Sequence, residues 1–127
     1  RVQITGDRDW SDYLTIEKAL RAVLDDDDPQ TVIVVHGAAR GADSIAGEVA
    51  TELGCKVEVF PADWKKYGRA AGPIRNTEML DSGPDVVLAF HDDLKSSKGT
   101  KNCVEQALKR NITVLYFTTE TFSEDVL

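Results

Sequence analysis

Five short apolar runs recur along the chain, at intervals that leave room for a helix between successive runs. They cover residues 1–5, 31–35, 55–60, 85–90 and 112–117. Most of the middle runs, above all residues 31–35 and 85–90, are almost continuously apolar and rich in Val, with no regular alternation of apolar and polar residues. That pattern is typical of strands in a parallel sheet that is buried on both faces. The runs therefore predict about five strands, each covered by helices on two sides.

The segments between the runs carry apolar residues at helical spacing. They predict helices over residues 13–24, 42–53, 73–81 and 99–111. Pro73 suits the first turn of the third helix, because its missing N–H group has no helical partner at that position. The fourth helix is expected to direct Val104, Ala107 and Leu108 inward.

Alternation of strands and helices defines the fold class. A helix between successive strands predicts an α/β fold with right-handed crossovers. We expect a doubly wound parallel sheet of about five strands between two helical layers, a three-layer α/β/α arrangement. The chain of 127 residues fits a single domain. Residues 118–127 follow the last strand, and we expect them to form a peripheral tail.

Composition narrows the class of partner. Hydrophobic residues make up 42% and charged residues 29%, which is the balance of an ordinary globular domain. The formal net charge is −7, and a run of aspartates at residues 25–28 supplies much of it. Proteins that bind nucleic acid through its phosphates usually present a basic face. A nucleic-acid partner is therefore not expected.

The cysteines and the apolar runs indicate the compartment. Cys55 and Cys103 form no CxxC or Cys/His spacing that holds a metal. We expect two free thiols in a reducing compartment, with no metal and no cofactor. No apolar run approaches the ~20 residues of a membrane span, and no signal-peptide pattern is found. These features predict a cytoplasmic protein without a membrane partner.

The candidate binding and catalytic residues lie mainly in the connections that follow the strands. In doubly wound sheets, ligands bind beyond the carboxyl ends of the strands. The connections at that edge hold both tryptophans, most glycines and four arginines, in residues 6–10, 36–43, 61–76 and 96–100. The connections at the opposite edge are plainer. This asymmetry predicts a ligand site at the carboxyl edge of the sheet.

Two of these connections have the character of anion-binding helix starts. Residues 97–100 open a helix with hydroxyl groups and a glycine, and free N–H groups at such a terminus favour an anion. In the second connection, Gly41 lets backbone approach a ligand, and Arg40 offers bidentate contacts to phosphate. The alternative is a plain Ser/Thr cap in the first connection. In the second, it is a solvated Arg40 with Asp43 compensating the helix dipole.

Arg75 is the most telling single residue. If Pro73 lies in the first turn of its helix, so does Arg75, and the helix dipole opposes a cation there. An arginine at that position makes sense if it reaches an anionic ligand, and the alternative is an ion pair with Glu78 or Asp63. His36 follows an apolar strand and is more consistent with a buried, hydrogen-bonded side chain than with a catalytic base.

Aromatic and acidic residues offer further contacts. Trp64 can wall a base or ribose by stacking, and for Trp10 we favour packing. Asp63, Glu78 and Glu105 are candidate carboxylates for stabilising an oxocarbenium-like transition state, and no spacing selects among them. The chain contains no P-loop, no GxSxG elbow and no GxGxxG motif. The signatures of kinases, serine hydrolases and simple dehydrogenases are therefore missing.

Together, these connections resemble the SLOG superfamily, and most closely its YspA/YpsA-like branch. The matching pieces are GDRDW at residues 6–10, HGAARGAD at 36–43, PADW at 61–64, GRAAGPIRN at 68–76 and SKGT at 97–100. The resemblance implies a Rossmann-like fold over residues 1–117, a nucleotide or nucleotide-derived ligand, and a homodimer or higher homo-oligomer. The superfamily also includes the DNA-processing protein DprA and the Lonely Guy phosphoribohydrolases, which cleave the N-glycosidic bond of nucleoside monophosphates.

The similarity to the phosphoribohydrolase motif is partial. The chain matches that motif at Arg75, Met79, Gly99 and Thr100. Cys103 stands where the motif carries its glutamate, and Glu105 lies further along the helix. Residues 95–97 replace the Pro-Gly-Gly stretch of the motif. The comparison favours phosphate binding over hydrolysis.

Three functions are compatible with these features. The first is a ligand-binding or sensing domain, with predicted binding residues Gly6, Arg8, Trp10, Gly37, Arg40, Gly41, Asp43, Trp64, Arg69, Asn76, Ser97, Gly99 and Thr100. The second is a nucleoside-monophosphate N-glycosidase, with Arg75, Glu105 and Asp63 as catalytic residues. The third is DprA-like binding of single-stranded DNA along Arg69, Lys95, Lys98 and Lys101, which the acidic charge disfavours. The sequence leaves open whether the protein is an enzyme.

Overall fold

A computed structural model describes residues 1–119. Its strands are β1 (Val2–Gly6), β2 (Ile33–His36), β3 (Lys56–Val59), β4 (Val86–Phe90) and β5 (Thr113–Phe117). Its α-helices are α1 (Tyr13–Leu24), α2 (Ala42–Leu53), α3 (Trp64–Tyr67), α4 (Ala71–Asp81) and α5 (Gly99–Lys109), with short 3-10 helices η1 (Pro29–Thr31), η2 (Gly68–Ala70) and η3 (Leu94–Ser96). Within this range, no helix is long and apolar enough to cross a membrane. Residues 120–127 of the expected tail lie outside the described residues.

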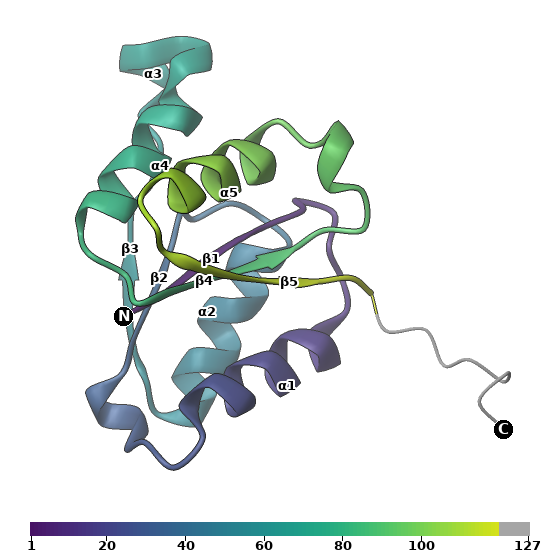
Figure 1. The fold of residues 1–127 in the computed structure, drawn as a ribbon, viewed down its shortest axis with the longest axis vertical. Helices are drawn as coiled ribbons and strands as arrows, with labels where there is room; N and C mark the ends of the chain where they lie inside the picture. Colours follow the sequence, from purple (N-terminus) through teal and green to yellow (C-terminus); the bar gives the residue numbers. More distant parts are fainter. Residues whose placement is uncertain (120–127) are drawn as a thin grey trace, which may run out of the picture.

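The sheet is parallel throughout and has the strand order β3-β2-β1-β4-β5. Helices α1 and α2 cover one face, and α4 and α5 cover the other (Figure 1). This arrangement confirms the predicted doubly wound α/β fold. The chain moves outward from β1 through β2 to β3 and then returns to β4, on the other side of β1. The carboxyl ends of β1 and β4 therefore border the crevice at which such sheets bind ligands.

The connection after β3 contains helical turns where the sequence predicted a loop. It contains the short helices α3 and η2, and α4 follows directly at Ala71. Pro73 is thus the third residue of α4, where its missing N–H group is still tolerated. Arg75 is the fifth residue of the helix. Its predicted place in the first turn is therefore wrong, and the helix dipole opposes its positive charge less than expected.

Leu108 is an apolar residue whose predicted burial is also wrong. Its exposed fraction is 57%, whereas Val104 and Ala107 on the same helix are buried. Successive residues of a helix point about 100° apart. The face that carries Cys103, Val104 and Ala107 toward the sheet consequently directs Leu108 sideways.

The two faces of the sheet are packed differently. On the side of α1 and α2, buried residues from both helices and three strands form one large apolar cluster. On the side of α4 and α5, the cluster is small and consists of Leu80, Val87, Cys103 and Ala107. The central strand β1 shows the difference, because Ile4 enters the large cluster while Gln3 donates from Nε2 to Cys103 Sγ at 3.3 Å. The face beneath α4 and α5 therefore holds buried polar groups.

Candidate functional site

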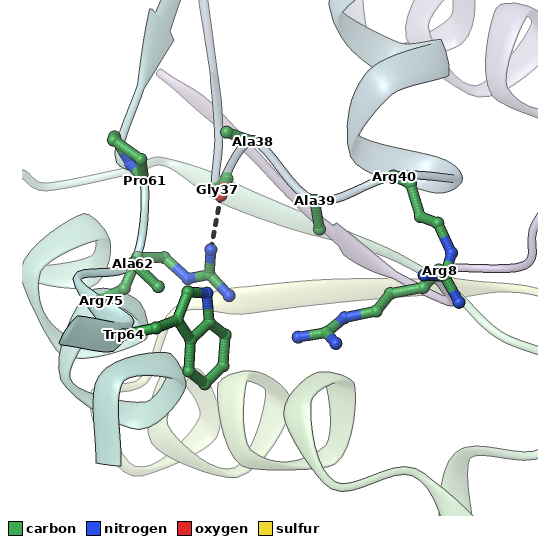
Figure 2. A pocket seen from close by; sticks show the side chains of 9 residues that line it. All are labelled: Arg8, Gly37, Ala38, Ala39, Arg40, Pro61, Ala62, Trp64 and Arg75. Carbon is green, nitrogen blue, oxygen red and sulfur yellow. Dashed lines mark hydrogen bonds between the residues drawn. The ribbon is translucent and has the colours of Figure 1, made fainter. Parts of the chain in front are cut away.

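A cleft opens at the carboxyl edge of the sheet, where β1 and β4 end. Its volume is about 840 Å³, which lies within the range of small-molecule sites. A recess of about 330 Å³ lies next to it, between the β2–α2 connection and the start of α3 (Figure 2). Arg8, Arg40, Trp64 and Arg75 line both spaces. The cleft and the recess are therefore neighbouring parts of one site.

Most residues selected from the sequence line this site. The cleft is lined by Gly6, Arg8, Arg40, Asp43, Trp64, Arg69, Arg75, Asn76, Ser97, Gly99 and Thr100, and the recess also by Gly37. They come from four connections that are far apart in the sequence. The fold brings these connections together because the carboxyl ends of parallel strands meet at one edge of a sheet.

Trp10 and Gly41 line neither space. Trp10 is buried, its ring meets Phe90 edge-on with centroids 5.7 Å apart, and its Nε1 donates to the carbonyl of Asp12 at 2.9 Å. Gly41 has a φ of 75°, and a Cβ atom there would lie 2.4 Å from the carbonyl oxygen of Asp7. Only glycine fits this close approach of two loops. Both residues thus support the backbone next to the site and do not face the ligand space themselves.

Arg75 projects from α4 across the end of β2 and is held there. Its Nη1 donates to the carbonyl of Gly37 at 2.6 Å, and its Nε donates to Asn76 Oδ1 at 3.1 Å. A Cβ atom on Gly37 would lie 2.1 Å from Arg75 Nη1, so glycine is needed for this contact. Buried Asn76 in turn donates from Nδ2 to the carbonyl of Gly99 and to Asn102 Oδ1. The guanidinium is therefore fixed by α4, α5 and the β2–α2 connection together.

The charge of Arg75 is incompletely compensated. Among residues 1–119, no carboxylate forms an ion pair with it, and the predicted alternatives Glu78 and Asp63 do not reach it. Partial burial lowers the pKa of the guanidinium, nearby Asp43 opposes this shift, and Arg8 adds to the lowering by repulsion. A bound anion would offset both the cost of burying the positive charge and the repulsion from Arg8.

Asp43 and His36 stabilise the β2–α2 connection by accepting hydrogen bonds from its N–H groups. Asp43 Oδ2 accepts from the N–H groups of Gly37 at 3.0 Å and Ala39 at 3.3 Å. His36 Nδ1 accepts from the N–H group of Ala38 at 3.0 Å. Burial raises the pKa of Asp43 and lowers that of His36. Since three consecutive N–H groups of this loop already have partners, an anion in the recess must be bound mainly by side chains.

The start of α5 forms the serine cap that the sequence left as an alternative. Ser97 Oγ accepts from the N–H groups of Thr100 at 3.1 Å and Lys101 at 3.3 Å. Ser97, Lys98, Gly99 and Thr100 all line the cleft. The cap consumes two of the N–H groups that were expected to bind phosphate. This helix start is therefore a weaker anion site than the arginines.

The carboxylates selected as catalytic residues lie outside the site. Asp63 caps α3 by accepting from the N–H group of Lys66 at 3.1 Å, and Glu105 lies exposed on α5 with its Oε1 4.0 Å from Lys101 Nζ. Neither lines the cleft or the recess. The acidic residues that do are Asp7, Asp9 and Asp43. Within residues 1–119, no group of three or more His, Cys, Asp or Glu side chains is placed to hold a metal ion.

Several lining residues were not selected from the sequence. Asp7 and His91 occupy equivalent places, because Gly6 pairs with Phe90 and each residue directly follows its strand. Their position after an apolar run was a signal that could have identified both. Asn102 lines the cleft from the first turns of α5, and that place could be recognised only once Asn76 was known to contact it.

The fold and the site define a class: a Rossmann-like α/β protein with an arginine-lined cleft at the switch point of its sheet. The chain belongs to the YspA, cpYpsA-related SLOG family, whose sequence profile matches residues 1–67. It is 44% identical over 122 residues to the Gene 61 protein of Mycobacterium phage D29, and the match covers 92% of this chain and 95% of that protein.

A solved structure has the same fold. The X-ray structure of DNA processing protein A (DprA) from Streptococcus pneumoniae superposes with a TM-score of 0.72 at 17% sequence identity. The match covers 97% of this chain and 52% of that chain, so this chain spans about half the length of that structure. At this identity the likeness shows the fold alone, which agrees with the parallel sheet expected from the sequence.

Proposed function

We propose that the cleft binds a nucleotide or a nucleotide-derived phosphorylated ligand, and that the protein acts as a ligand-binding or sensing domain. The observation that carries this proposal is Arg75, a partly buried guanidinium fixed by Gly37 and Asn76 and left without an ion-pair partner in the described chain. Holding a cation in this way costs free energy unless a ligand compensates the charge. Arg8 and Arg40 line the same recess, so the site is basic in an acidic protein.

Trp64 supports a ligand with an aromatic base. Its side chain is 49% exposed and lines both the cleft and the recess. The Arg8 guanidinium lies 5.6 Å from the centroid of the indole ring, a cation–π contact. An exposed indole beside guanidinium groups can stack on a base while the arginines bind its phosphate.

Calorimetric titration with nucleoside phosphates of each base tests the proposal. We expect at least one to bind, and Arg75→Gln to weaken that binding about tenfold or more, because a charge-assisted hydrogen bond contributes about 1.5–3 kcal/mol. Arg21→Gln, at an exposed position of helix α1, is the matched control for loss of one positive charge and should bind as the wild type does. Failure of every phosphorylated nucleoside to bind would refute the proposal.

Binding without cleavage is the form of the proposal that the geometry favours. Hydrolysis of the N-glycosidic bond needs a carboxylate beside the ribose, and Glu105 and Asp63 lie outside the cleft. Asp7, Asp9 and Asp43 line it, but each already accepts hydrogen bonds from, or forms an ion pair with, neighbouring loop groups. We therefore expect no release of free base from nucleoside monophosphates in a chromatographic assay. Release that is lost in Asp7→Asn or Asp43→Asn would instead establish the N-glycosidase alternative.

A further inference from the structure

The recess beside the cleft has an unusual charge balance. Three of its nine lining residues are arginines, and no carboxylate is among those lining residues in the described chain. Arg8 comes from the β1–α1 connection, Arg40 from the β2–α2 connection and Arg75 from α4. The three charges thus enter from different elements and share one space (Figure 2).

The guanidinium groups are spread along the recess. Figure 2 shows Arg75 at the end formed by Pro61 and Ala62, Arg40 at the opposite end and Arg8 between them. Arg75 is held by Gly37, whereas Arg40 Nη2 has a loose contact with Asp9 Oδ1 at 3.3 Å. Both side chains of that pair are largely exposed, so it is weak and easily replaced.

A single phosphoryl group does not use this arrangement fully. Because the N–H groups of Gly37, Ala38 and Ala39 already have partners, the guanidinium forks must supply the contacts. One phosphoryl group placed against Arg75 leaves Arg40 with Asp9 at the far end. A second, linked phosphoryl group extends toward Arg40 and adds one more negative charge between the arginines.

We propose that the recess binds two linked phosphoryl groups, so that the ligand is a nucleoside diphosphate or a molecule built on one. This inference rests on the proposed function of the cleft. Arg75 holds the first phosphoryl group, Arg40 holds the second, and Arg8 bridges them. The nucleoside lies in the wider cleft, beside Trp64.

The test compares ligands that differ by one phosphoryl group. Calorimetry of the full chain with a nucleoside monophosphate and diphosphate of the same base, and with inorganic phosphate and pyrophosphate, separates the phosphate contribution from that of the base. We expect the diphosphate and pyrophosphate to bind about tenfold more tightly than their single-phosphate counterparts. Arg40→Gln should abolish this preference and change monophosphate binding less than about threefold. Arg75→Lys, which keeps the charge but loses the fork, should weaken all four ligands.

The outcomes distinguish this inference from the broader function. Equal affinity for monophosphate and diphosphate overturns the inference and leaves the proposed nucleotide site standing. An equal loss of both affinities in Arg40→Gln also overturns it, because Arg40 would then contact the first phosphoryl group. Absence of binding by every nucleotide overturns both proposals. Arg21→Gln controls for net charge, and thermal unfolding of each variant controls for folding.

Discussion

The two faces of the sheet differ in what they bury, and the difference locates the site. Beneath α1 and α2, Ile4, Ile16, Leu20 and Val49 belong to one continuous apolar cluster. Beneath α4 and α5, the buried side chains include Gln3, Thr5, Asn76 and Thr100, and the apolar cluster is small. The first face provides stability, and the second gives up part of its apolar packing to hold polar groups at the edge of the cleft.

Arg75 shows how this division is used. A guanidinium within the apolar cluster of the α1 and α2 face would be surrounded by aliphatic and aromatic side chains. Between α4 and β2 it instead finds the carbonyl of Gly37 and the amide oxygen of Asn76. The helices of the polar face therefore carry the side chains that position the cation. Changes within the apolar cluster should alter stability without altering binding, and changes to the polar side chains that hold Arg75 should alter both.

The largest expected effect is that of Leu20→Ala on the apolar face. Leu20 is 1% exposed, and its truncation should lower the free energy of unfolding by about 2–5 kcal/mol. Leu14→Ala on the same helix is the control, because Leu14 is 43% exposed and should cost less than about 1 kcal/mol. Urea unfolding measures both. A nucleotide affinity that falls in folded Leu20→Ala would contradict the division between the faces.

Asn76→Ala should affect both stability and binding. It leaves the carbonyl of Gly99 and Arg75 Nε without their partner, which should cost about 1–3 kcal/mol of stability and weaken nucleotide binding about tenfold. Thr77→Ala is the control, because the Thr77 hydroxyl donates a hydrogen bond to Gln106 Oε1 between the same two helices and does not contact Arg75. Equal losses of affinity in both variants would show that Asn76 acts through general helix packing, not by positioning Arg75.

Gln3→Met should stabilise the protein by about 1 kcal/mol. Gln3 is fully buried in β1, and its Oε1 has no hydrogen-bond partner among residues 1–119. Met has a similar shape and removes this unsatisfied oxygen. Gln3→Glu should do the opposite, because it places a carboxylate at the same buried position. A clear loss of stability in Gln3→Met, measured by thermal unfolding, would contradict the reading of Gln3 as an energetic cost of the polar face.

The smallest expected effect is a dependence of stability on pH through His36. Its Nδ1 must be unprotonated to accept from Ala38, and burial lowers its pKa below the usual 6.5. A base whose pKa is lower in the folded state destabilises that state as pH falls through its unfolded pKa. The free energy of unfolding of the wild type should therefore decrease as the pH is lowered from about 7.5 to about 5.5.

His36→Asn provides the comparison for this effect. The Asn oxygen can accept from Ala38 in place of Nδ1 and does not titrate. We expect a shallower fall in urea-unfolding stability for this variant over the same pH range. Asp43, whose pKa is raised by burial, contributes with the opposite sign and is present in both proteins. Identical pH profiles would exclude His36 as the cause.

The regular part of the fold could be predicted from the sequence. Apolar runs identified all five strands, and the lack of alternation in residues 31–35 and 85–90 indicated a parallel sheet. The site was placed at the right edge by the general rule for such sheets. Boundaries were less exact: Thr31 belongs to η1, and β2 begins at Ile33.

The local features of the site depend on contacts between distant residues. Helix α3 is too short to show a helical period, so the start of α4 and the place of Arg75 were misjudged. The engagement of Asp43 with the loop N–H groups and the position of Glu105 outside the cleft follow from side-chain directions that one sequence does not reveal. Arginine and glycine content located the site, and packing determined how each side chain is used.

Tryptophan fluorescence tests the central claim most directly, because Trp64 lines the cleft while Trp10 is buried away from it. Titration of a nucleoside phosphate into the wild type should change the emission. In Trp64→Phe, where Trp10 remains, the change should be lost, although calorimetry still detects binding at reduced affinity. An unchanged emission response in Trp64→Phe would place the ligand elsewhere on the molecule and contradict the account.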